Sequence, residues 1–190
     1  RKATWIVRIE TTKKPEAQLL GSAIGMKVMA EVPFIVGLDQ WLPGGLDEDA
    51  KTYLKDFGAA TASNGAVGLY HVENITPEAV KYGKDLIKEN AQVYVVELER
   101  VYKSYPVIWK KKDATPKLCF MGCPHMSLNQ LIDWTKKIEE GLKKYGKTRV
   151  CIPTVFTAAP AVLKKFEETP YAATLKQAGV ITSYICPLMY

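Results

Sequence analysis

Residues 118–134 read LCFMGCPHMSLNQLIDW, and this stretch decides the fold class. Its apolar start predicts a buried strand over residues 117–122, which Gly122 ends in a turn. Ser127, followed three residues later by Gln130, forms a capping-box pattern that predicts the start of a helix. A strand that leads through a short turn into a helix is the building unit of α/β folds.

The same alternation of strand and helix patterns runs along the whole chain. The expected strands are 5–10, 66–72, 92–97, 117–122, 148–153 and 180–185, with a further apolar run at 32–38 that Pro33 interrupts. The expected helices are 17–30, 46–62, 76–90, 98–105, 127–145, 158–168 and 170–178. Strands that alternate with helices predict βαβ units, so we expect an α/β fold with mainly parallel sheets and flanking helices.

Prolines and lysines cluster at residues 106–117, where we expect a boundary between two lobes. A first α/β lobe is expected over residues 1–106, and a second lobe with the cysteine turns over residues 117–190. The chain begins with Arg1 rather than Met, and a strand pattern follows almost at once. We therefore expect a fragment or processed chain whose first lobe has lost an amino-terminal part.

Composition restricts the class of protein. The chain has 190 residues, 47% of them hydrophobic, which is enough to build one globular domain or two small ones. Four irregularly spaced cysteines favour reduced thiols in a cytoplasmic protein over a disulfide scaffold. No apolar run has the length of a membrane helix. The net charge of +6 comes from scattered lysines, without a nucleic-acid-binding motif.

Two of the cysteines follow predicted strands and precede proline. Cys123 follows strand 117–122, and Cys186 directly follows strand 180–185. Because the carboxyl ends of parallel strands lie along one edge, the two thiols come close together if their strands are close in the sheet. Two thiolates there favour an iron–sulfur cluster over zinc, because no CxxC or HxxxH pair accompanies them. The alternative is that both are ordinary buried thiols.

Other candidate residues have weaker patterns. Cys119 and Cys151 fall inside predicted strands and are expected in the core, while a nucleophile pair of Cys123 with His125 is disfavoured by the intervening proline. Residues 63–65 are expected to turn the chain into the strand over 66–72, which carries His71 near its end. We assign His71 and Ser63 to substrate binding. The alternative for His71 is a structural histidine bonded to a loop carbonyl.

Three segments carry a resemblance to a known family. They are SNGAVGLYHV with a following TPE within residues 59–78, GCPH with SL within 121–131, and AGV through the final CP within 178–187. In this order and spacing they resemble the large subunit of the aconitase X family. The resemblance implies aconitase-like three-layer α/β/α lobes. It also implies a dehydratase with an iron–sulfur cluster on three cysteines, of which Cys123 and Cys186 match two and the third lies outside this chain.

The family has two branches, and the resemblance to the archaeal one is stronger. Residues 182–185 (TSYI) before Cys186 differ from the Asp-Thr-Cys of the hydroxyproline branch, and the lysine-rich composition fits an archaeal protein. The resemblance therefore implies a hydro-lyase subunit that dehydrates (R)-5-phosphomevalonate to trans-anhydromevalonate 5-phosphate in isoprenoid biosynthesis. The implied partner is a small subunit, in a heterodimer, and the isolated chain is expected to be inactive. The alternative in the same family is a cis-3-hydroxy-L-proline dehydratase.

Two interpretations from other classes remain open from the residues alone. One is a non-catalytic ligand-binding α/β module in which no metal binds and both Cys-Pro turns are structural. The other is a thiol-dependent enzyme that uses Cys123 as its nucleophile. The pattern assigns neither the general base nor the residues that bind phosphate.

Overall fold

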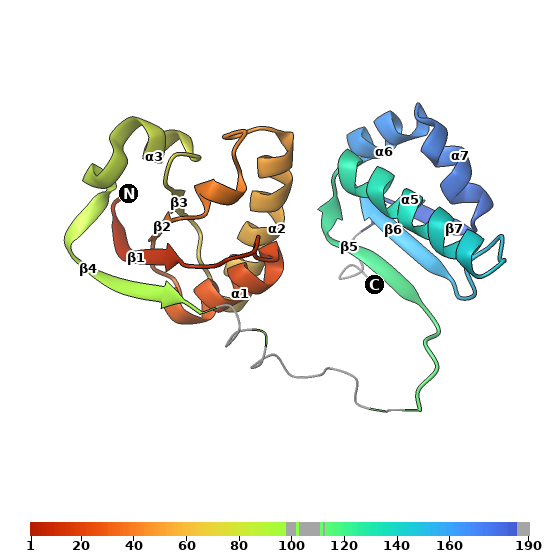
Figure 1. Cartoon of the computed structure of the whole chain (residues 1–190), viewed down its shortest axis with the longest axis horizontal. Helices are drawn as coiled ribbons and strands as arrows, with labels where there is room; N and C mark the ends of the chain where they lie inside the picture. Colours follow the sequence, from red (N-terminus) through yellow and green to blue (C-terminus); the bar gives the residue numbers. More distant parts are fainter. Residues whose placement is uncertain (98–101, 103–110, 112, 186–190) are drawn as a thin grey trace. The chain divides into compact units, whose positions relative to one another are not determined.

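The computed structural model describes residues 1–97, 102, 111 and 113–185. The chain divides into two compact units, Arg1–Ile108 and Trp109–Tyr190, each with its own sheet (Figure 1). The helix expected over residues 98–105 lies outside the described residues except for Tyr102, which is helical. None of the helices in the described part of the chain has the length and hydrophobicity needed to cross a bilayer.

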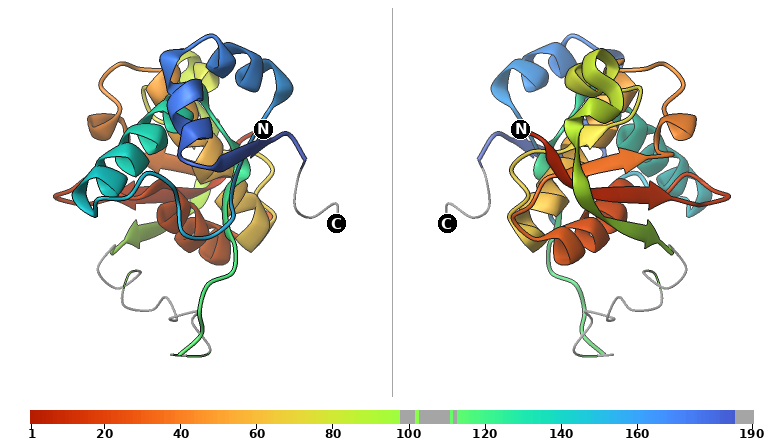
Figure 2. Two further views of the ribbon diagram at one scale, coloured as in Figure 1. Left: turned by 90° about the vertical axis from the view of Figure 1, so that its right-hand side faces the viewer. Right: turned by 90° about the vertical axis from the view of Figure 1, so that its left-hand side faces the viewer.

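The amino-terminal unit is built on a parallel sheet. Its elements are β1 (Ala3–Ile9), α1 (Ala17–Val28), β2 (Pro33–Val36), the 3-10 turn η1 (Asp39–Trp41), α2 (Glu48–Gly65), β3 (His71–Val72), α3 (Pro77–Tyr82), the 3-10 turn η2 (Gly83–Leu86) and β4 (Ile87–Val96). The strand order is β3-β2-β1-β4, and every neighbouring pair is parallel (Figure 2, right). The predicted α/β class with parallel strands is confirmed for this unit.

Helices lie on both faces of this sheet. Alternate residues of β1, such as Val7 and Ile9, are buried in one cluster with α1 and α2. Phe34 points to the opposite face, where it packs in a second buried cluster with Ala79 of α3. These two clusters give the unit three layers, helix–sheet–helix, because each face of the sheet needs an apolar cover.

The two large helices of this unit touch through glycines. A Cβ on Gly25 would lie 2.7 Å from the carbonyl oxygen of Thr61, and a Cβ on Gly65 would overlap the Gly25 carbonyl. Asn64 strengthens the contact, because its Nδ2 donates to Ser22 Oγ and to the Ala60 carbonyl, both at 3.0 Å. The turn expected at residues 63–65 is therefore wrong, since these residues form the last turn of α2.

Two further expectations for this unit are wrong in their bounds. The strand expected over 66–72 is reduced to His71–Val72, and the helix expected over 76–90 ends at Tyr82. Gly83 stops the helix with a positive φ of 51°. β4 then begins at Ile87, five residues before the expected strand.

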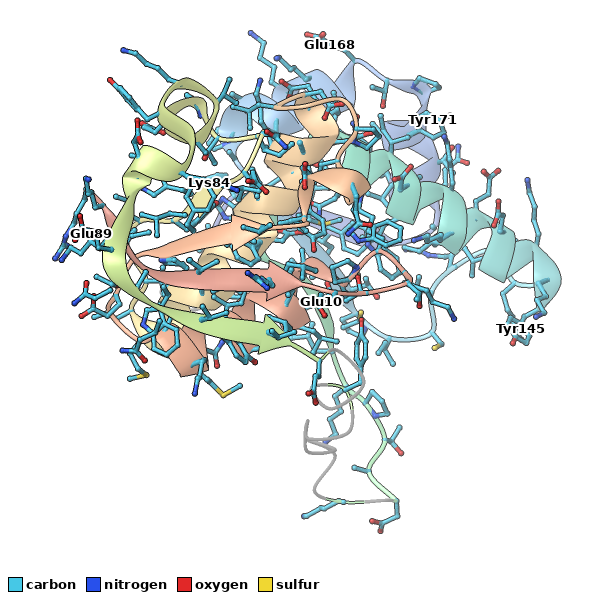
Figure 3. The ribbon with its side chains drawn as sticks, turned by 60° about the vertical axis from the view of Figure 1, so that its left-hand side comes forward. Glu10, Lys84, Glu89, Tyr145, Glu168 and Tyr171 are labelled. Carbon is cyan, nitrogen blue, oxygen red and sulfur yellow. The ribbon has the colours of Figure 1, made fainter. Side chains whose placement is uncertain are left out.

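The first half of β4 escaped prediction because it is polar. Its sequence is IKENAQVYVV, and Lys88 and Glu89 are exposed. Glu89 lies at the outer side of this edge strand (Figure 3). Hydrophobic patterning detects strands by a buried face, which this stretch does not have.

Tyr53 joins α2 to the segment before α1. Its hydroxyl donates to the Pro15 carbonyl oxygen at 3.0 Å. Burial, and then the negative charges of Glu16 and Tyr102, raise the pKa of Tyr53 well above its ordinary value of 10.0. Because the folded state holds this proton more tightly than the unfolded chain, the stabilisation is complete below about pH 10 and is lost as the pH rises further.

We expect the free energy of unfolding of this unit to fall between about pH 10 and pH 12, and to fall less in Tyr53→Phe. The variant also loses one buried hydrogen bond, which should cost about 1 kcal/mol at neutral pH. Urea unfolding followed across this pH range measures both effects. An equal alkaline decline in the parent and in Tyr53→Phe would contradict the assignment to Tyr53.

The carboxyl-terminal unit holds the sequence that defined the fold class. Its elements are β5 (Cys119–Met126), α5 (Leu128–Lys144), β6 (Thr154–Ala158), α6 (Pro160–Glu167), α7 (Pro170–Gln177) and β7 (Val180–Ser183). The strand order is β5-β6-β7, again with parallel pairs. The predicted capping box is confirmed: Ser127 Oγ accepts from Gln130 N at 3.3 Å, and Gln130 Oε1 accepts from Ser127 N at 2.9 Å.

The strand expected over 148–153 is wrong, because β6 begins only after Pro153. Residues 148–152 form bends instead of a strand, and Val150 N donates to the Ala178 carbonyl oxygen at 2.9 Å. Cys151 is exposed there, and Cys119 is only partly buried. The expectation of two core thiols is therefore not met by either cysteine.

The core of this unit lies between its sheet and its three helices. Phe156 of β6 packs there with Leu131 of α5, Phe166 of α6 and Leu175 of α7. The opposite sheet face carries a row of apolar side chains in register, Phe120, Val155 and Ile181. Ile181 is 58% exposed, whereas Phe120 and Val155 are half-buried.

Candidate functional site

Cys123 lies in a bulge near the carboxyl end of β5. In the register of β5 with β6, Met121 pairs with Phe156, whereas Met126 pairs with Ala158. Residues 122–125 of β5 therefore face Thr157 alone. The strand does not end at Gly122 as expected, but it departs from regular pairing at that residue.

A close contact between Gly122 and Thr157 holds the bulge. Thr157 is fully buried, and its Oγ1 donates to the Gly122 carbonyl oxygen at 2.9 Å. Gly122 has a φ of 132°, a backbone angle that residues with a side chain rarely adopt. A Cβ at this position would overlap Thr157 Oγ1 and lie 2.6 Å from the Thr157 carbonyl oxygen. Glycine is required here both by conformation and by space.

The bulge presents its cysteine outward. Cys123 is exposed, and its peptide bond to Pro124 is cis. His125, which follows Pro124, is partly buried. Because α5 follows at Leu128, the thiol lies where the carboxyl ends of the strands meet the start of a helix.

The strand before Cys186 ends at the same edge. Thr157 pairs with Ser183 of β7, and Ile185 N donates to Ser183 Oγ at 3.1 Å. Cys186 itself lies outside the described residues. β6 stands between β5 and β7, so the strands that lead to Cys123 and Cys186 are both neighbours of β6 but not of each other.

A complete metal site is not found within the described residues. No group of three or more His, Cys, Asp or Glu side chains there is placed to hold a metal ion. Cys123 is exposed at this edge and carries a thiol, which is the donor type that iron–sulfur clusters take. The described residues thus offer one thiol of the expected donor type, and the assignment of Cys123 and Cys186 as cluster ligands stays a prediction.

The other two assigned residues lie in the amino-terminal unit. Ser63 is exposed on α2 and donates to the Ala60 carbonyl oxygen at 3.3 Å. His71 is only 1% exposed, and its Nε2 lies 3.0 Å from the Arg1 carbonyl oxygen. That contact matches the structural alternative for His71, and its substrate role stays a prediction, as does that of Ser63.

Both units contain a hollow that is lined entirely by described residues. In the amino-terminal unit a hollow of about 410 Å³ is lined by Gly68, Tyr70 and Thr76, from the segment 59–78, and by Lys51 and Lys55 of α2. Both lysines already have carboxylate partners, Glu48 at 2.7 Å and Asp56 at 2.8 Å.

In the carboxyl-terminal unit an apolar groove of about 580 Å³ lies against α5 and the sheet, and its lining includes Cys119, Cys151 and Trp134. Cys123 does not line this groove, which runs from Cys119 and Thr154, at the starts of β5 and β6, to Met121 and Phe156, the last regular pair before the bulge. The two thiols that were expected in the core therefore line a surface groove instead.

Thr157 is the site residue that the sequence did not reveal. The expected strand covers 148–153, so it does not include Thr157. A usable signal existed in Gly122, because a glycine directly before a strand-end cysteine indicates a close backbone approach by a neighbouring strand. The sequence alone does not identify the neighbour.

Comparison with known proteins gives a consistent result for both units. A family model described as the aconitase X second domain matches residues 3–105. The phosphomevalonate dehydratase large subunit of Thermococcus kodakarensis is 32% identical over 167 residues, which cover 85% of this chain and 38% of that protein. The large subunit of the same name from Methanosarcina mazei is 36% identical over 129 residues, 68% of this chain and 28% of that protein.

More distant relatives and a solved structure agree. The cis-3-hydroxy-L-proline dehydratase of Pseudomonas aeruginosa is 26% identical over 84% of this chain and 26% of its own length. The crystal structure of Thermococcus kodakaraensis aconitase X in its holo-form superposes with a TM-score of 0.71 and 28% identity, over 96% of this chain and 43% of that one. The chain thus spans less than two-fifths of the length of the curated relatives named here.

Proposed function

Because this chain belongs to the aconitase X family, we propose that it is part of the large subunit of a phosphomevalonate dehydratase. The enzyme would remove water from (R)-5-phosphomevalonate to give trans-anhydromevalonate 5-phosphate, in a cytoplasmic isoprenoid pathway. The observation that carries the proposal is the similarity to four phosphomevalonate dehydratase large subunits at 30–36% identity. Cis-3-hydroxy-L-proline dehydratases match at 26–30%, and they define the second candidate function.

We assign Cys123 as one ligand of an iron–sulfur cluster and Cys186 as a second. A bound cluster with an open iron site would supply a Lewis acid that makes the substrate hydroxyl a better leaving group. The residues of this chain hold and orient the thiolate. The exposed position of Cys123 supports this role, because a ligand thiol must reach beyond its own sheet. The capped start of α5 fixes the downstream end of the bulge.

The partner in this proposal is a small subunit, since the relatives are named large subunits. The phosphorylated substrate would contact residues that this chain does not contain, in addition to Ser63 and His71. Because the chain spans 38% of the Thermococcus relative, we expect it to have no dehydratase activity alone.

The test is anaerobic iron–sulfur reconstitution of the full-length large subunit together with its small subunit. We expect a visible cluster absorption band and water loss from (R)-5-phosphomevalonate, detected by mass spectrometry as a product lighter by one water. Cis-3-hydroxy-L-proline is the matched second substrate, and turnover of it alone would favour the second candidate function. A reconstituted complex without a cluster and without turnover of either compound would overturn the proposal.

A further inference from the structure

We propose that Thr157 is a positioning residue for the iron ligand Cys123, and that its hydroxyl sets the direction in which the thiolate leaves the sheet. The inference rests on the proposed function, because it takes Cys123 as a cluster ligand. Thr157 does not contact the reacting atoms in this proposal. It acts on Cys123 through the backbone of Gly122.

The hydrogen bond to Gly122 constrains the peptide unit that enters Cys123. Thr157 Oγ1 donates to the Gly122 carbonyl oxygen at 2.9 Å. That carbonyl shares one planar peptide unit with the Cys123 N–H group, so fixing the oxygen also fixes the bond from which the Cys123 backbone continues. In a bulge that lacks regular pairing, this bond replaces the ladder hydrogen bonds that would otherwise orient the residue.

The surroundings make the bond specific. Thr157 is fully buried, so water does not compete for its hydroxyl. Its side chain is β-branched, which restricts its χ1 rotamers. Thr157 approaches Gly122 so closely that no side chain would fit at position 122. The Thr157 hydroxyl and the Gly122 carbonyl oxygen therefore meet in one arrangement. This buried contact sets the direction of the exposed Cys123 thiol.

The experiment compares Thr157→Val, Thr157→Ser and Cys123→Ser in the full-length large subunit reconstituted with its small subunit. Valine keeps the branched shape and removes the hydroxyl, while serine keeps the hydroxyl. The measurements are the EPR spectrum of the cluster and the rate at which a chelator removes iron. Loss of an outer partner of a metal ligand costs about 10- to 100-fold in metal affinity, so Thr157→Val is expected to lose iron at least about tenfold faster.

The serine variant is expected to keep the parental EPR spectrum and an iron-release rate within about twofold of the parent, because the donated bond is retained. If Thr157→Val does not fold, as judged by circular dichroism, Thr157→Ala takes its place beside Thr157→Ser. These two variants lose the same methyl group and differ only in the hydroxyl. An altered spectrum in alanine but not in serine supports the proposal.

The outcomes separate this inference from the proposed function. If Cys123→Ser keeps the parental cluster, the ligand assignment fails, and the role of Thr157 fails with it. If Cys123→Ser loses the cluster while the variants without the hydroxyl keep the parental spectrum and iron-release rate, the proposed function stands. The positioning role of Thr157 is then overturned.

Discussion

Replacing Cys123 by serine in the full-length large subunit is expected to reduce cluster iron after reconstitution by at least about tenfold. A serine hydroxyl has nearly the same size but is a harder and less acidic donor than a thiol, so it is a poor ligand for iron–sulfur clusters. Cys123 is exposed on its bulge, so the substitution should leave the core of the unit intact. Iron analysis and the visible absorption band measure the effect.

Cys151→Ser is the matched control in the same unit. Cys151 is also exposed and free, but it lies three residues before β6, at the opposite end of the sheet from the bulge. We expect this variant to bind as much iron as the parent. Equal iron in the Cys123 variant, or equal loss in both variants, would show that the bulge does not hold the cluster.

Replacing Gly65 by alanine is expected to destabilise the amino-terminal unit by about 3 kcal/mol, near the upper end of what overpacking costs. The added methyl group would overlap the carbonyl group and the Cα of Gly25 on the facing helix. Backbone atoms cannot move aside as a flexible side chain can, so α1 and α2 would have to separate. Their separation would also stretch the hydrogen bond between Asn64 and Ser22.

Gly68→Ala provides the control within the same unit. Its added Cβ would have no neighbour within 4 Å, and its backbone is not in the left-handed region. We expect a change of at most about 1 kcal/mol, in the stabilising direction, because alanine restricts the unfolded chain. Amide hydrogen exchange of α1 and α2 reports the stability of this unit directly. A Gly65 variant as stable as the Gly68 variant would contradict the close helix contact.

The sequence predicted helix α5 well because its signals are local. The capping box of Ser127 and Gln130 and the helical spacing of apolar residues gave 127–145, and the helix spans Leu128–Lys144. The fold class followed from the alternation of such elements. The position of Cys123 near the carboxyl edge of a strand also followed from local patterns.

Strand β6 was misplaced because its buried hydroxyl groups look polar in a sequence. It reads TVFTA, and Thr154 and Thr157 are both buried. Each hydroxyl donates to a carbonyl oxygen, of Ile152 at 3.1 Å and of Gly122 at 2.9 Å, which offsets the cost of burial. The second of these partners lies 35 residues away along the chain, so no local pattern reveals it.

The edge strand β4 has a practical consequence for anyone who produces this chain alone. Within the described residues β4 pairs with one strand only, which is β1. Its second half, QVYVV, carries no charge, and Val93 and Val95 are 55% and 41% exposed. Uncharged edge strands of this kind recruit further chains and promote aggregation, whereas Lys88 and Glu89 protect only the first half. Low protein concentration, or a lysine in place of Val93, is the appropriate precaution in handling the chain.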